Sequence, residues 1–142
     1  MSGDGLSRYL GSVVRRRFAF GKMDCCILMA DWLVCCGLPD AMADRRGAYA
    51  SWREYRALMR REGGIVASCK RRFGAVGLEE RDAPARGDVC LVRAPIVLGR
   101  RVLWVPTGAI CLSPGMSVVV TPDAGLMGAP MTVLHAWGLP DA

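Results

Sequence analysis

The sequence has very little histidine: His135 is the only one among its 142 residues. Thiol enzymes need a base beside the sulfur, and that base is usually an imidazole. A Cys–His catalytic pair in this chain would therefore have to use His135, which lies in the predicted last strand. Internal repeats and low-complexity segments are also lacking, which excludes repeat architectures.

Long apolar runs are lacking as well. The longest candidate, residues 25–37, is interrupted by Asp31 and falls short of the roughly 18 residues that a membrane span needs. Residues 1–12 lack the charged and then apolar pattern of a secretory signal. We therefore expect no membrane span and synthesis in a cytoplasm, where the seven cysteines would be reduced.

The overall composition of the chain is apolar and basic. Hydrophobic residues make up 52% of the chain and charged residues 23%, which is typical of a globular domain and not of a disordered chain. The net charge of +6 is uneven, since residues 1–72 carry +7 and residues 73–142 carry −1. A basic half suggests an anionic neighbour, and a solvated arginine-rich surface is the alternative. Nucleic acid is not expected as a partner, because no recognition module is found.

The hydrophobic pattern changes along the chain from helical to strand-like. Helical periodicity predicts helices at 6–17, 25–36, 52–62 and 65–74, with Asp24 and Ser51 as N-caps. A loop at 75–86 is followed by five strand-like segments, at 87–92, 101–106, 108–113, 117–122 and 131–137. We therefore predict one α+β domain, residues 1–142. A helical half (about 5–74) packs on an antiparallel sheet of about five strands (about 87–139).

Four cysteines lie in the segment FGKMDCCILMADWLVCCG. On a helix, Cys26 and Cys35 would be roughly 13 Å apart along the axis, too far for a disulfide or a shared metal ion. We therefore predict no metal and no cofactor. Cys25 differs from the others because it follows the N-cap Asp24, where free N–H groups and the helix dipole favour a thiolate. Cys25 is the candidate nucleophile, and a small buried apolar residue is the alternative interpretation.

Asp31 lies on the same apolar helix and needs a cationic partner, because an unpaired buried carboxylate is costly. One of the many arginines is the expected partner, for example Arg53 or Arg56 of the third predicted helix. On that helix, Trp52, Tyr55 and Met59 are predicted to point inward.

The segment FAFGKMDCCILMADW resembles the nucleophile segment of the NlpC-type cell-wall peptidases, which are papain-like cysteine enzymes. The matching residues are Phe18, Phe20, Gly21, Asp24 and Cys25. Downstream, GDVCLV resembles the family's Gly-Asp strand, and TGAICLSPG resembles the strand that begins with its catalytic histidine. The resemblance covers about residues 18–120. It implies a papain-like NlpC-type fold with Asp24 and Cys25 in the catalytic site.

The chain also resembles small NlpC-like proteins encoded near the tail-tip genes of long-tailed phages and gene-transfer agents. The shared features are the DC…ADW helix and the RGAY and GG segments, here residues 46–49 and 63–64. This resemblance implies a virion component of the tail tip, made in the host cytoplasm. Its expected partners are tail hub or distal tail proteins, and peptidoglycan.

The chain departs from the family pattern at the base. The family's histidine position falls on Thr107 or Gly108, and neither side chain can accept a proton near neutral pH. Two hypotheses follow. The protein is a peptidoglycan peptidase or amidase with Cys25 as nucleophile and His135 as a displaced base, or it is an inactive adaptor or plug of the tail tip that binds hub proteins.

Overall fold

The computed structural model describes residues 3–140, which form an α+β fold as predicted. Its helices are α1 (Gly3–Val13), α2 (Cys25–Cys35), the short 3-10 helix η1 (Ala43–Arg45), α3 (Trp52–Arg61) and α4 (Ile65–Ala75). Its strands are β1 (Glu79–Arg81), β2 (Val89–Leu98), β3 (Arg101–Ser113), β4 (Met116–Thr121), β5 (Gly125–Ala129) and β6 (Thr132–Gly138). Among these residues, no helix has the length and hydropathy that crossing a bilayer would take.

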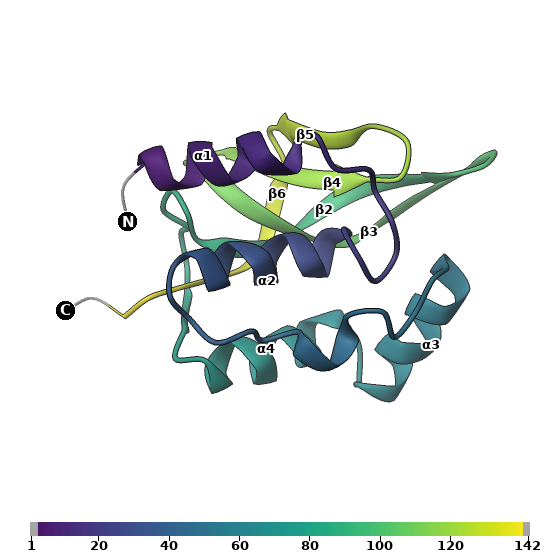
Figure 1. Ribbon diagram of the computed structural model, residues 1–142, viewed down its shortest axis with the longest axis horizontal. Coiled ribbons are helices and arrows are strands. Elements are labelled where there is room, and N and C mark those ends of the chain that lie inside the picture. The colour runs from purple at the N-terminus through teal and green to yellow at the C-terminus, as the bar shows by residue number, and fades with distance from the viewer. Residues whose placement is uncertain (1–2, 141–142) are drawn as a thin grey trace.

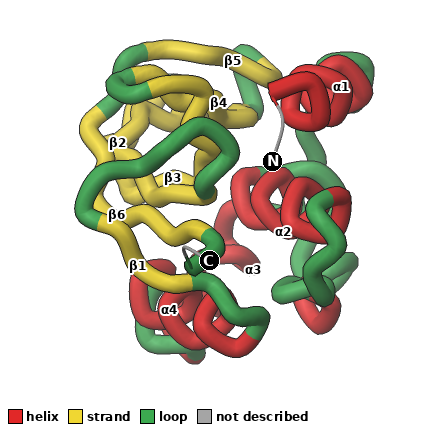
Figure 2. The backbone as a smooth tube through the Cα atoms, turned by 90° about the vertical axis from the view of Figure 1, so that its left-hand side faces the viewer, coloured by secondary structure: helices red, strands yellow, loops and turns green. Residues whose placement is uncertain are grey.

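All six strands belong to one antiparallel sheet with the order β1-β6-β2-β3-β4-β5. The last strand, β6, therefore lies between β1 and β2. Helix α2 packs against β3 and β4. In both views it lies between α1 on one side and α3 and α4 on the other (Figures 1 and 2). The nucleophile helix of the sequence prediction is thus the central helix of the fold.

The sheet has an apolar core on each face. On the helical side, residues 26–30 of α2 are fully buried among side chains of the sheet and of the other helices. A second, smaller core contains only small or β-branched residues, namely Cys90, Val92, Ala94, Ala109, Val119 and Ala136. Helix α2 is apolar nearly all round, with Asp31 as its one charged residue. This suits a helix enclosed by other elements, and its prediction as the buried central helix is confirmed.

The prediction of the strands needs three corrections. The expected loop at 75–86 contains strand β1, and strand β5 was not expected at all. The segments 101–106 and 108–113 form one strand, β3, which continues through Pro106. Pro106 is tolerated because β3 pairs with β4 only at residues 110–113, so at Pro106 it is an edge strand and the missing N–H faces no partner.

The prediction that an arginine pairs with Asp31 is confirmed, but the two arginines given as examples, Arg53 and Arg56, are not its partners. Its carboxylate accepts hydrogen bonds from Arg16 Nη1 at 3.1 Å and from Arg46 Nη2 at 2.6 Å. Arg53 and Arg56 lie on α3 instead and make no ion pair with it. Arg16 lies in the turn after α1, and Arg46 directly follows η1. Both come close to α2 in the fold, and no local sequence pattern indicates this.

Candidate thiol site

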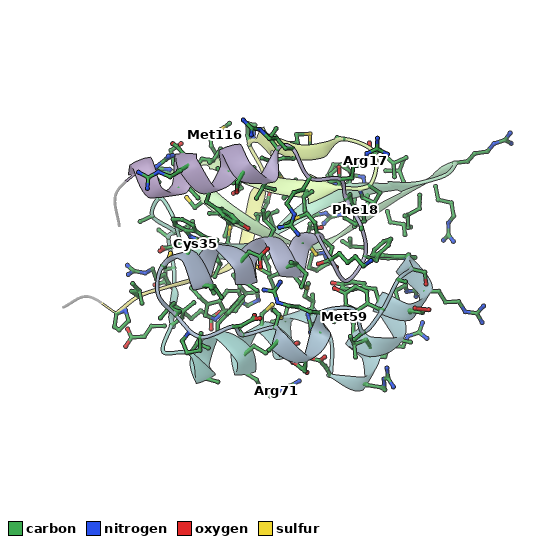
Figure 3. All side chains as sticks on the ribbon, viewed as in Figure 1. Arg17, Phe18, Cys35, Met59, Arg71 and Met116 are labelled. Atoms are coloured by element: carbon green, nitrogen blue, oxygen red, sulfur yellow. The ribbon has the colours of Figure 1, made fainter. Side chains whose placement is uncertain are left out.

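Cys25 is the first residue of α2 and borders a pocket of about 440 Å³. It is half-buried, whereas Cys26 beside it is fully buried. Figure 3 shows Phe18 and Met59, which also line the pocket, at the opposite end of α2 from Cys35. Cys35 and Cys36 therefore belong to the other end of the helix, and the four cysteines do not form one cluster.

Asp24 is the N-cap of α2, as predicted. Its Oδ1 accepts hydrogen bonds from the backbone N–H groups of Cys26 and Ile27, each at 3.0 Å. Its Oδ2 accepts from the Gly21 N–H at 2.7 Å and from the Tyr49 hydroxyl at 2.5 Å. With both oxygens engaged, the buried carboxylate positions the start of α2 and does not face the pocket.

Three neighbouring groups act on the pKa of the Cys25 thiol as hydrogen-bond donors: the Cys26 side chain, the backbone N–H of Gly108 and the Tyr55 hydroxyl. Hydrogen bonds to the charged form of a group favour that form. The bond from Cys26 contributes most, and together these donors lower the pKa of the Cys25 thiol although burial opposes the shift. Burial raises the pKa of Tyr55, so its hydroxyl stays protonated and available as a donor.

Cys26, the donor with the largest effect on Cys25, itself accepts a hydrogen bond from a buried arginine. The hydrogen bond to Cys25, with burial, raises the pKa of Cys26 well above its ordinary value, so Cys26 keeps its proton. Arg45 Nη1 donates to the Cys26 sulfur at 3.0 Å. Arg45 is 0% exposed, and it thus forms the start of a donor chain that runs through Cys26 to Cys25.

Arg45 is held in place by Glu62 and Ser68. Its Nη2 and Nε donate to the two Glu62 carboxylate oxygens at 2.9 and 3.3 Å, and Nη2 also contacts the Ser68 hydroxyl. Burial acts to raise the pKa of Glu62, but the hydrogen bonds from Arg45, Ser68 and Arg72 lower it to about 2. The carboxylate is therefore charged at neutral pH, and it holds the Arg45 guanidinium beside the Cys26 sulfur.

Gly108 is one of the two positions at which the resemblance would place the histidine, and it cannot hold a side chain here. A Cβ atom on Gly108 would lie 2.6 Å from the Cys25 carbonyl oxygen and 2.5 Å from Met29 Cε. The neighbouring Thr107 hydroxyl donates to the Val105 carbonyl at 3.1 Å. Strand β3 therefore supplies a backbone donor to Cys25 and no base.

His135 lies on β6 and is engaged elsewhere. Its Nδ1 is 2.7 Å from Glu80 Oε1, and its ring stacks on Trp137. Gly108 pairs with Leu91, and Leu91 pairs with His135. Two strand spacings, or roughly 10 Å, thus separate the Gly108 and His135 backbones. The structure brings Cys25 and Asp24 together at the start of α2, and it places His135 outside the residues that line the pocket.

Sequence reasoning missed most of the thiol's neighbours. Tyr55 was predicted to point inward, and it does, but its contact with Cys25 was not foreseen. Arg45 directly precedes the RGAY segment, and this was the one signal that could have singled it out. Among residues 3–140, no three side chains of the metal-binding types gather into a possible metal site.

Comparison with known families gives one match. A family described as Domain of unknown function (DUF6950) matches residues 3–139, a range that includes the four α-helices and all six strands. No curated protein and no solved structure matches the chain.

Proposed function

The chain belongs to the DUF6950 family, and for this member we propose the function of an NlpC-type, papain-like cysteine peptidase or amidase at a phage tail tip. The observation that supports it is the position of Cys25, at the first turn of a buried helix, facing a pocket and surrounded by donors that favour its thiolate. A helix N-terminus with adjacent donors is the environment that makes a cysteine nucleophilic.

In this proposal the Cys25 thiolate attacks the carbonyl carbon of an amide in the wall peptide. A C–S bond forms, the amide C–N bond breaks, and the amine leaves after taking a proton, so that water can then hydrolyse the thioester. The proton needs a donor. The only imidazole of the chain is that of His135, which would have to leave Glu80 to supply it, so we expect slow turnover.

The proposed tail-tip location rests on the resemblance of the DC…ADW and RGAY segments to those of small NlpC-like proteins encoded near tail-tip genes. Within this chain the RGAY residues support the thiol site. Arg46 binds Asp40 and Asp31, Gly47 N–H donates to the Gly21 carbonyl at 2.9 Å, and Tyr49 binds Asp24. These motif residues hold the loop before Cys25, which gives a physical reason for the two segments to occur together.

The second candidate function is an adaptor of the tail tip that binds hub proteins. It is favoured by the hairpin of β2 and β3, which projects from the body of the protein (Figure 1). Val102 and Trp104 on this hairpin are 57% and 59% exposed, and the neighbouring Arg100 and Arg101 are exposed too. Exposed aromatic and arginine side chains are frequent anchors of protein interfaces.

A wall-digestion assay separates the two candidates. Purified peptidoglycan is incubated with the protein, and newly released amino groups are quantified. We expect Cys25→Ala to reduce release to background and His135→Ala to reduce it by about 10²-fold or more. Cys35→Ala, at the exposed opposite end of α2, is expected to leave it unchanged.

Undiminished release by Cys25→Ala would contradict the peptidase proposal. Absence of release by the natural sequence, together with normal tail assembly by Cys25→Ala and failed incorporation by a Val102→Asp, Trp104→Asp double variant, would support the adaptor instead.

A further inference from the structure

The pocket in front of Cys25 is almost entirely apolar. Aromatic and aliphatic side chains from four parts of the chain line it, among them Phe18, Phe20, Trp52, Ile65 and Val105. Its volume of about 440 Å³ lies within the usual range of small-molecule sites. None of the lining residues is a carboxylate, so the pocket offers no counter-charge to a cationic ligand.

Two arginines line the same pocket. Arg56 and Arg60 lie four residues apart on α3, and therefore on one face of the helix. Both are exposed, and neither side chain makes a hydrogen bond or ion pair with any residue between 3 and 140. Arg45, Arg46 and Arg72, in contrast, each bind a carboxylate. Two adjacent like charges without a counter-ion repel each other, and a bound anion would relieve the repulsion.

We propose that this pocket binds an amphipathic anion, with an apolar chain or ring inside the pocket and a carboxylate or phosphate held by Arg56 and Arg60. The guanidinium groups supply charge-assisted hydrogen bonds to the anion, and the aromatic lining removes the apolar part from water. Neutral polyhydroxyl ligands fit poorly, because their buried hydroxyl groups would lack partners.

This inference deepens the proposed function and rests on it for the site's role. It names the substrate class as an acyl or peptide group with an apolar moiety and a nearby acidic group. Of a wall polymer, the pocket would accept the peptide part and not the glycan. Ligand binding itself does not depend on the reactivity of Cys25, so the two proposals can fail separately.

Calorimetric titration with four octyl compounds tests the inference. Octanoate and octyl phosphate carry the anion, octanol lacks the charge, and octyltrimethylammonium reverses it. We expect octanoate, octyl phosphate or both to bind at least about tenfold more tightly than octanol, and the cation to bind more weakly than these anions. The relative affinities of the two anions tell whether the site prefers a carboxylate or a phosphate.

Matched variants on one helix locate the anion. The Arg56→Gln, Arg60→Gln double variant should weaken binding of the preferred anion about tenfold or more. The Arg53→Gln, Arg61→Gln double variant removes the same charge from exposed positions of α3 that do not line the pocket, and it should leave the affinity unchanged.

Several results would overturn the inference: no binding of either anion, octanol binding as tightly as octanoate, or equal weakening by the two double variants. Cys25→Ala is titrated in parallel. Full anion binding by this variant, combined with failure of the wall-digestion assay, would leave the ligand site established and reject only the peptidase proposal.

Discussion

Replacement of Arg45 by methionine is expected to lower the free energy of unfolding by about 3 kcal/mol or more. Removal of one member of a buried ion pair typically costs 3–5 kcal/mol, and Arg45 is fully buried between Glu62 and Cys26. Arg72 also donates to Glu62, so the carboxylate keeps one partner and the loss should fall at the lower end of that range. Denaturant unfolding at neutral pH measures the effect.

Arg46 provides the control, since it follows Arg45 directly and binds two carboxylates at the surface. Exposed ion pairs contribute about 0–1 kcal/mol, so Arg46→Gln should cost much less than Arg45→Met. Equal costs for the two variants would show that the buried position of Arg45 has no special importance.

Arg45→Met should also raise the pKa of Cys25. The substitution removes the hydrogen bond from Arg45 to the Cys26 sulfur, and Cys26 is the donor that lowers the Cys25 pKa most.

Gly108→Ala is expected to be almost as damaging as the Arg45 replacement. The new Cβ would lie 2.6 Å from the Cys25 carbonyl oxygen, and backbone on both sides of the contact leaves little room to adjust. Overpacking of this kind costs about 1–3 kcal/mol, and we expect the upper end. Movement of α2 away from β3 would also separate the Gly108 N–H from the Cys25 sulfur.

Gly74 of α4 is the matched control for this substitution. Nothing lies within 4 Å of a Cβ placed there. Gly74→Ala should therefore stabilise the protein by about 0.4–1 kcal/mol, because alanine lowers the conformational entropy of the unfolded chain. A neutral or stabilising effect of Gly108→Ala in the same unfolding experiment would disprove the close contact of α2 with β3.

The parts of the fold that the sequence could predict are those set by local signals. Asp24 and Ser51 were predicted as N-caps, and each accepts a backbone hydrogen bond at the start of its helix. Helix α2 was predicted to be central because it is apolar nearly all round. These features depend on residues within a few positions of each other, which a single sequence displays.

The features that could not be predicted depend on contacts between distant segments. Strand β5 has few β-branched residues and forms because β4 offers it an edge. Nothing near Cys26 in the sequence indicates that Arg45, 19 positions away, would donate to its sulfur. The spacing of His135 from Cys25 depends on the strand order, which places β2 between β3 and β6, and no local pattern encodes that order.

The central claim is that Cys25 is a thiolate nucleophile made acidic by its donors. The most direct test is the pH dependence of its alkylation by iodoacetamide, followed at each cysteine by peptide mass spectrometry, with Cys35 as the exposed comparison. We predict that the alkylation rate of Cys25 rises with a midpoint clearly below about 8.5, the usual pKa of a cysteine. A Cys25 midpoint at or above that value would contradict the claim.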